Sequence, residues 1–273
     1  MININVKKFI KLIIPSFLTK NINKLFNRKI KFEGSYKNWR AAYNKSLGYD
    51  SSVIFNNVRK SFLKVIRKEA KYERDSVLFY SEEINYPLIK ILKKNQDKKK
   101  FCLKVLDFGG SFGSTYFQNY TILGDENKFH WSIIEQKKIV NFARRFELPS
   151  NLFFFSSIKS YIKKHNPDVV LFSSVLQYLE FPYRIINFFI KKKIKNIIIL
   201  KTPFSKKKEL IKIQIVPKHI YDASYPIRIF NEKFFSKLFK DNNYKIIPSL
   251  FINEQIDNIF FKNFIFKLNN YDN

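Results

Sequence analysis

The sequence predicts an α/β fold with a seven-stranded, mostly parallel sheet and helices on both of its faces. From Phe101 onward, short β-branched or aromatic runs alternate with segments of helical periodicity. Strands separated by helices of about 10–15 residues form βαβ units and therefore a parallel sheet. The chain has 273 residues, 45% of them hydrophobic. This is enough for one domain of about 200 residues with a sizeable core, plus an extension.

The individual elements follow from local sequence. A turn at Gly48 and a cap at Ser51 or Ser52 predict a helix that ends near Ala70, because apolar residues recur there at helical spacing. A second helix is expected over about residues 82–94, with Pro87 in its early turns. The seven strands are expected at Leu103–Phe108, Trp131–Glu135, Leu152–Phe155, Val169–Ser173, Ile197–Lys201, Tyr244–Ser249 and Asn263–Leu268.

The charge of the chain is strongly basic and unevenly distributed. There are 51 basic and 22 acidic residues, for a net charge of +29. Lysine is abundant throughout, which is typical of AT-rich coding sequence, and nucleic-acid binding is therefore not favoured. Residues 1–32 contain no acid and form a basic amphipathic segment broken at Pro15, too short to span a membrane and without a signal-peptide cleavage site. We expect peripheral contact with an anionic membrane, or packing of this segment on its own domain.

The cysteine and histidine content excludes two classes of protein. A single cysteine, Cys102, cannot build a disulfide scaffold. The three histidines are scattered, so no zinc or iron-cluster spacing can be formed and no metal is expected.

The clearest motif is a glycine cluster that follows the first strand of the expected sheet. Three of the six glycines, Gly109, Gly110 and Gly113, lie within five residues, which indicates a sharp turn with close approach of backbone to a ligand. The spacing matches neither a P-loop nor the dinucleotide pattern. Asp107 precedes the first glycine and would repel a pyrophosphate but suits a cationic or amino-bearing ligand such as S-adenosyl-L-methionine (SAM).

Val105–Gly113 resembles the first motif of class I SAM-dependent methyltransferases. Glu135 at the end of the second strand and the segment 168–179 fit the same pattern. Together with Tyr72–Phe79 and shorter motifs up to Pro226, the chain resembles, over about residues 33–255, a bacterial methyltransferase family found with surface-polysaccharide (O-antigen type) biosynthesis genes. This implies a Rossmann-like class I methyltransferase fold, SAM as cofactor, and a cytoplasmic location at or near the inner face of the membrane.

The resemblance also divides the chain into three parts. Residues 1–32 would be the basic amino-terminal segment, residues 33–100 a helical cap on the substrate side, and residues 101–273 the SAM-binding domain. The acceptor would be a small molecule or a lipid-linked glycan.

The resemblance further implies roles for individual residues in binding SAM. Asp107 would hold the methionine amino group directly or through water, and Glu135 would bind the ribose hydroxyls. The other expected cofactor-binding residues are the three glycines, Ser111 for the carboxylate, Gln136 near adenine, Ser156 or Ser157 for the adenine amino group, and Ser173 and Gln177 at the turn after the fourth strand. The serines could instead be helix caps that do not contact the cofactor.

The residues that would perform catalysis are less narrowly defined. Methyl transfer needs alignment, and a general base if the acceptor is a hydroxyl of high pKa. The candidates are His219 near an expected acceptor loop, the cluster Glu73, Arg74 and Asp75, and Tyr178 facing the acceptor. The cluster could instead be a salt-bridged connector, and Tyr178 could have a packing role.

The leading hypothesis is a SAM-dependent O-methyltransferase acting on a sugar or glycan intermediate of cell-surface polysaccharide. A non-catalytic SAM- or nucleotide-binding subunit of a polysaccharide assembly complex is the alternative, because no general base stands out. An RNA-binding or RNA-modifying protein is the third hypothesis, motivated by the net charge.

Overall fold

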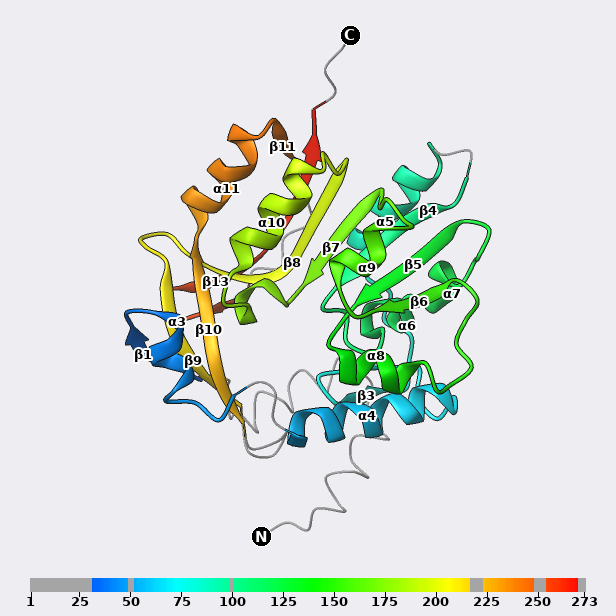
Figure 1. The fold of residues 1–273 in the computed structure, drawn as a ribbon, viewed down its shortest axis with the longest axis horizontal. Helices are drawn as coiled ribbons and strands as arrows, with labels where there is room; N and C mark the ends of the chain where they lie inside the picture. The colour runs from blue at the N-terminus through cyan, green and yellow to red at the C-terminus, as the bar shows by residue number, and fades with distance from the viewer. Residues whose placement is uncertain (1–30, 49–51, 99–100, 217–222, 248–253, 270–273) are drawn as a thin grey trace.

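A large mixed sheet with helices on both faces forms the centre of the molecule (Figure 1). The computed structural model describes residues 31–48, 52–98, 101–216, 223–247 and 254–269. The strands are β1 (Lys31–Tyr36), β2 (Tyr72–Arg74), β3 (Val77–Phe79), β4 (Leu103–Phe108), β5 (Phe129–Ile134), β6 (Leu152–Phe155), β7 (Val169–Ser173), β8 (Asn196–Ser205), β9 (Leu210–Ile215), β10 (Ser224–Asn231), β11 (Tyr244–Ile247), β12 (Glu254–Ile256) and β13 (Ile259–Leu268).

The helices cover the sheet and connect its strands. They are α3 (Trp39–Tyr43), α4 (Ser52–Ile66), α5 (Tyr86–Gln96), α6 (Ser114–Gln118), α7 (Tyr120–Leu123), α8 (Lys137–Ala143), α9 (Ile158–Ile162), the short 3₁₀-helix η1 (Leu176–Tyr178), α10 (Pro182–Lys191) and α11 (Glu232–Asp241).

All seven predicted strands are present, and they are neighbours in one sheet. Their order is β6-β5-β4-β7-β8-β13-β11. The first five strands are mutually parallel, whereas β13 runs antiparallel to both β8 and β11. The predicted bounds of β4, β6 and β7 are confirmed, while β5, β8 and β13 differ in length from the prediction. Positions 248–249, predicted for the sixth strand, lie outside the described residues.

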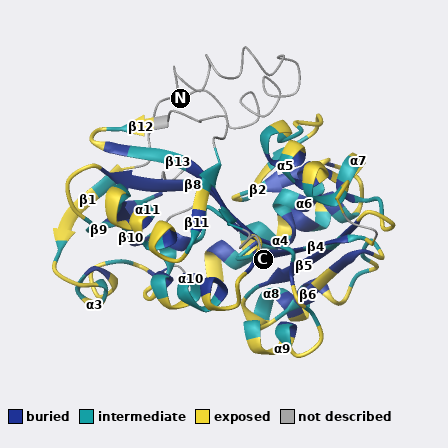
Figure 2. Cartoon of the chain, turned by 90° about the horizontal axis from the view of Figure 1, so that it is seen from above, coloured by how far each residue is buried: buried dark blue, intermediate teal, exposed yellow. Residues whose placement is uncertain are grey.

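Alternation along the strands gives the sheet two buried faces. In β7, Val169 and Leu171 belong to one apolar cluster, and Val170 and Phe172 to another on the opposite face. Helices α4, α5, α6 and α8 cover the first face, and α9, α10 and α11 cover the second. Figure 2 shows the central strands buried between exposed outer helix faces. Strands buried on both faces read as continuous apolar runs, and this is why they could be predicted.

The structure contains an extension of the sheet that the sequence did not predict. β8 continues past β7, and its last residues pair with β10, with Phe204 opposite Phe230. β10 pairs antiparallel with β9, and β9 pairs antiparallel with β1. Residues 33–100 are therefore not purely helical, because β1 joins the main sheet and β2 and β3 form a hairpin. The boundaries of the three proposed parts of the chain remain a prediction.

Both predicted helices of this amino-terminal region are present, with shifted ends. α4 ends at Ile66, before Ala70, and Lys68 just beyond it has a left-handed φ of 60°. α5 begins at Tyr86 because the side chain of Asn85 accepts a hydrogen bond from the backbone N–H of Leu88, at 3.2 Å.

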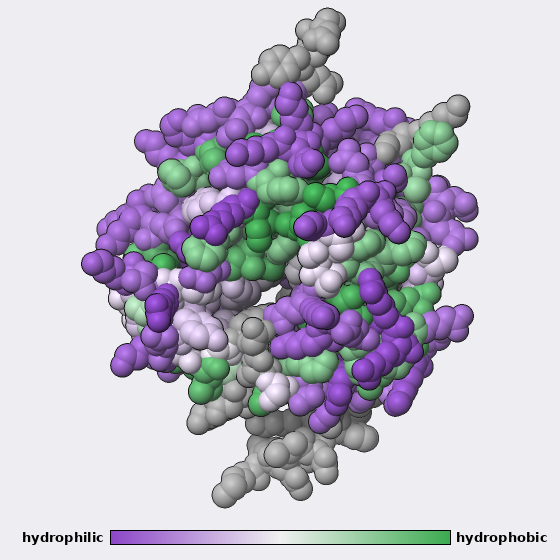
Figure 3. All heavy atoms as spheres, in the orientation of Figure 1, coloured by the Kyte–Doolittle hydropathy of each residue, from purple (hydrophilic) through white to green (hydrophobic). Residues whose placement is uncertain are grey.

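The basic segment 1–32 lies outside the described residues except for its last two positions, which belong to β1. Within the described part of the chain, no helix combines the length and apolar character that crossing a bilayer requires. Figure 3 shows hydrophilic side chains over most of the rim of the visible face and apolar ones near its middle.

Phe62 of α4 provides a test of how firmly this helix is held. Its ring is 1% exposed and stacks on Phe112 with centroids 4.5 Å apart. We expect Phe62→Ala to lower the free energy of unfolding by about 3–5 kcal/mol, since it removes buried area and leaves a cavity. Phe101, which is 74% exposed, is the matched control, and Phe101→Ala should change stability by less than about 0.5 kcal/mol. Equal losses in urea denaturation of the two variants would contradict this account.

Candidate functional site

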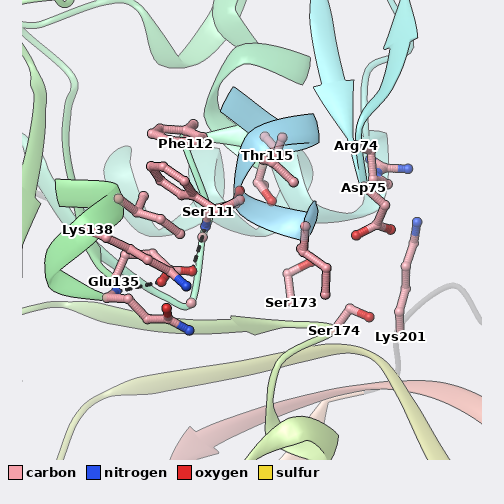
Figure 4. Close-up of a pocket in the computed structure, with 18 residues that line it drawn as sticks. Arg74, Asp75, Ser111, Phe112, Thr115, Glu135, Lys138, Ser173, Ser174 and Lys201 are labelled. Atoms are coloured by element: carbon pink, nitrogen blue, oxygen red, sulfur yellow. Dashed lines mark hydrogen bonds between the residues drawn. The ribbon is translucent and has the colours of Figure 1, made fainter. Parts of the chain in front are cut away.

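A pocket opens at the carboxyl ends of β4, β5 and β7, beside the turn that leads into α6 (Figure 4). In parallel sheets this edge is where ligands bind. The pocket is lined by residues from both the sheet and the amino-terminal region: Ile54, Phe55, Val58, Arg74, Asp75, Gly109, Gly110, Ser111, Phe112, Ser114, Thr115, Glu135, Gln136, Lys138, Ile139, Ser173, Ser174 and Lys201.

The turn between β4 and α6 requires glycine at two positions. Gly109 has a φ of +72°, and a Cβ there would lie 2.3 Å from Cγ2 of Val175. Gly113 has a φ of +96° and directly precedes α6. Only glycine adopts such angles without strain, and no larger residue would fit against Val175. The predicted sharp turn with close backbone approach is therefore present, and its backbone forms one wall of the pocket.

Glu135 lines the pocket at the end of β5 and is held by backbone donors. Oε1 accepts a hydrogen bond from the N–H of Ser111 at 3.2 Å, and Oε2 accepts one from the N–H of Gln136 at 2.6 Å. Both carboxylate oxygens are thus fixed at the wall of the pocket, where they can also accept hydrogen bonds from a ligand. Ser111 and Gln136 line the same region, and their roles in binding SAM remain predictions.

Asp107 is not at the pocket surface. Its side chain is completely buried and is not among the lining residues. A Cβ on Gly110 would lie 2.5 Å from Oδ2 of Asp107, so the glycine turn passes directly over the carboxylate. Burial raises the pKa of Asp107 to about 7, although the Trp131 indole N–H favours the ionised form. Neither carboxylate oxygen has an aligned hydrogen-bond partner among the described residues.

The three candidate residues on the β2–β3 hairpin have different positions. Glu73 is 3% exposed and does not line the pocket. Its carboxylate accepts hydrogen bonds from the Ser114 hydroxyl and from the N–H of Ser76, the latter at 3.2 Å. Arg74 lines the pocket and donates to Oε1 of Gln118 in α6. Asp75 lines the pocket and has a φ of 50° at the hairpin turn.

Lys201, which was not predicted as a site residue, reaches the pocket from the middle of β8. Two residues of β8, Leu200 and Lys201, oppose the single residue Asn263 of β13, which makes a β-bulge, and Lys201 has a φ of 49°. Its backbone N–H donates to Oδ1 of Asn263 at 2.8 Å. Bulges re-aim side chains, and Figure 4 shows the Lys201 ammonium group directed toward the Asp75 carboxylate.

The electrostatic environment of Asp75 reflects both its neighbours and its depth. Burial raises the pKa of Asp75, while the positive charges of Arg74 and Lys201 lower it. The side chain is accessible to solvent through the pocket even though protein surrounds it on most sides. The position of Lys201 as the last residue of a predicted strand was a signal that could have identified it.

Helix α4 forms the apolar wall of the pocket. Ile54, Phe55 and Val58 line the pocket, and Ile54 and Val58 belong to the face that the sequence predicted to be apolar. The ammonium group of Lys138 lies 5.7 Å from the centroid of the Phe55 ring. Thr115 and Ser173 add hydroxyl groups between this wall and the sheet edge.

Several predicted site residues lie away from the pocket. Ser156 is exposed and does not line it. Ser157 caps α9 by accepting a hydrogen bond from the N–H of Ser160 at 3.1 Å. This is the helix-capping role that was the alternative to binding adenine. Gln177 is fully buried, and its amide donates to Oγ of Ser174 at 3.0 Å. Gln177 can therefore position Ser174 but does not itself line the pocket.

Tyr178 also lies away from the pocket. Its hydroxyl donates to Oε1 of Gln214 at 3.1 Å, and its ring packs edge-on against Tyr225 with centroids 5.2 Å apart. These contacts belong to the β9–β10 extension and favour the packing role. His219 lies outside the described residues.

Comparison with known proteins identifies the fold. No protein-family profile and no curated protein sequence matches the chain. The N-terminal domain of EvdMO1, solved in the presence of S-adenosylhomocysteine (SAH) and D-fucose, has a TM-score of 0.50 at 9% identity, over 80% of this chain and 100% of that one. The same domain with SAH bound also gives 0.50 at 9% identity, over 77% and 97%.

A further similar structure is magnesium protoporphyrin IX methyltransferase (ChlM) from Synechocystis PCC 6803 with bound SAM, with a TM-score of 0.47 at 12% identity over 87% of this chain and 100% of that one. The sheet order and the similarity to the EvdMO1 domain confirm the Rossmann-like fold of class I SAM-dependent methyltransferases.

The buried Glu73 carboxyl group predicts a pH-dependent stability. Burial raises its pKa from 4.5 to about 7. The folded chain therefore binds this proton more tightly than the unfolded chain. The resulting stabilisation is full below pH 4.5 and is lost as the pH rises through about 7.

We expect Glu73→Gln, which mimics the protonated group, to become more stable relative to wild type across this window. The difference should grow by at most about 1.4 kcal/mol per pH unit. Urea denaturation at several pH values measures it, with Glu147→Gln at an exposed position as control. A constant difference between Glu73→Gln and wild type would show that the pKa of Glu73 is not raised in the folded protein.

Proposed function

We propose that the protein is a SAM-dependent methyltransferase. The observation that carries this proposal is the pocket that joins the glycine turn after β4 to the Glu135 carboxylate after β5. The fold is that of class I methyltransferases, and the EvdMO1 domain of the same fold was solved with SAH.

The residues of the pocket fit SAM chemically. The Glu135 carboxylate lines the pocket and can accept hydrogen bonds from ribose hydroxyls. Ile54 and Phe55 of α4, together with Ile139 of α8, suit a flat, largely apolar base. The glycine turn admits close approach of backbone N–H groups. When bound, SAM supplies a methyl group on a sulfonium centre that is attacked in line by a nucleophile.

The role of the protein in such a reaction is chiefly alignment and exclusion of water. Helix α4 covers the pocket with apolar side chains, and the stacked Phe62 and Phe112 rings fix this helix to the glycine turn. A wall held in this way restricts the orientations that a bound ligand can adopt.

We propose a hydroxyl group of a sugar or glycan intermediate as the methyl acceptor. Two observations support this class. The chain resembles methyltransferases encoded with polysaccharide biosynthesis genes, and the EvdMO1 domain was solved in the presence of D-fucose. Hydroxyl side chains from Thr115, Ser173 and Ser174 line the pocket and can exchange hydrogen bonds with sugar hydroxyls.

A non-catalytic SAM-binding subunit is the second candidate. Two of the residues expected to act as a general base do not line the pocket. Glu73 accepts a hydrogen bond from the Ser114 hydroxyl, and Tyr178 is hydrogen-bonded within the β9–β10 extension.

Titration calorimetry with SAM and SAH tests the cofactor site. We expect micromolar binding that Glu135→Ala weakens tenfold or more, about 1.4 kcal/mol. Glu147→Ala, at an exposed position after α8, removes the same charge away from the pocket and should leave the affinity unchanged. Absence of binding by the wild type, or equal weakening by both variants, would contradict the proposed site.

Incubation with methyl-labelled SAM separates the two candidate functions. Transfer of the label to a glycolipid or sugar-nucleotide fraction, extracted from cells that express the protein, would establish that the protein is a methyltransferase. Tight SAM binding without transfer to any fraction would favour the non-catalytic subunit.

A further inference from the structure

The pocket has two chemically different ends. Figure 4 shows Glu135 at one end and Asp75 with Lys201 at the other, with Ser111, Thr115 and Ser173 between them. Lys138 lies beside Glu135 at the first end, whereas at the second end one carboxylate is combined with two cations, Arg74 and Lys201. A ligand that spans the pocket therefore meets an environment of mixed charge at its second end.

The mixed-charge end is built by two segments far apart in the sequence. Arg74 and Asp75 come from the β2–β3 hairpin, and Lys201 comes from the bulge in the middle of β8. The hairpin is fixed to α6 by the hydrogen bond from Ser114 to the buried Glu73 and by the one from Arg74 to Gln118. The backbone at Lys201 is fixed by Asn263. Buried contacts on both sides thus determine the position of the cluster.

The carboxylate of Asp107, expected to meet the amino group of SAM, cannot contact a ligand in this pocket. The backbone of Gly110 lies between the carboxylate and the pocket, and the side chain is completely buried. Glu135 and Asp75 are the carboxylates that line the pocket in the described part of the chain. Because Glu135 lies where a ribose is expected, Asp75 is the lining carboxylate available to bind a cationic group of the ligand.

We propose that Asp75, Lys201 and Arg74 form the subsite for the amino-acid end of the cofactor. Asp75 would hold the ammonium group, and Lys201, aided by Arg74, would hold the carboxylate. An α-amino acid is a zwitterion whose two charges are adjacent, and a carboxylate flanked by cations is its complement. The inference rests on the proposed SAM-binding function. It assigns binding of the ammonium group to Asp75 of the β2–β3 hairpin instead of Asp107 of β4.

The assignment can be tested by calorimetry without knowledge of the methyl acceptor. Three ligands share the adenosine group and differ at the amino-acid end: SAH has both charged groups, decarboxylated SAM lacks the carboxylate and carries a methyl sulfonium in place of the thioether, and 5′-methylthioadenosine lacks both charged groups of the amino acid. We expect Asp75→Asn to weaken SAH and decarboxylated SAM tenfold or more and 5′-methylthioadenosine less than twofold. Lys201→Met should weaken SAH alone, because only SAH carries the carboxylate.

The controls distinguish a local effect from a general one. Asp97→Asn and Lys208→Met change the same residue types at exposed positions outside the pocket and should alter no affinity. Glu135→Ala should weaken all three ligands, because it contacts the part that they share. Retained binding of 5′-methylthioadenosine by Asp75→Asn and Lys201→Met also shows that these variants are folded.

The outcomes separate this inference from the proposed function. If wild type binds all three ligands but Asp75→Asn weakens them equally or not at all, the subsite assignment is overturned while SAM binding stands. If wild type binds none of them, the proposed function is overturned and the subsite with it. Selective loss of SAH and decarboxylated SAM supports both.

Discussion

The contact between two neighbouring βα turns is the constraint on which the site depends. The turn after β4 passes so close to the turn after β7 that no side chain fits at Gly109 against Val175. This contact places the backbone of the glycine turn at the edge of the sheet, where Glu135 can accept a hydrogen bond from Ser111. It also directs α6 toward the amino-terminal hairpin, since Ser114 at its start contacts Glu73.

Most of the central sheet could be predicted because its strands are buried on both faces. β7 is continuously apolar from Val169 to Phe172, and its bounds were predicted correctly. β1 was missed because most of its residues are exposed and it carries little apolar signal. β9 and β10 were missed because they belong to an antiparallel extension outside the βαβ alternation on which the prediction was based.

Pocket residues could be predicted from the sequence where backbone geometry dictates the residue type. They could be predicted less well where their position depends on tertiary contacts. The glycine turn and Glu135 could be located because both follow directly from strand ends. The burial of Asp107 could not, because it results from the backbone of Gly110 lying over the side chain. Lys201 enters the pocket through a bulge, and the pairing that creates this bulge involves β13, more than fifty residues later in the chain.

β8 gives the molecule a mechanical continuity between its two halves. Its first residues pair with β7 in the central sheet, and its last residues pair with β10 in the extension. Lys201 lies between these two stretches, at the bulge. The extension and the central sheet are therefore joined along a single strand, and Lys201 lies where its two stretches meet. The position of one ammonium group in the pocket thus depends on strand pairings made on both sides of it.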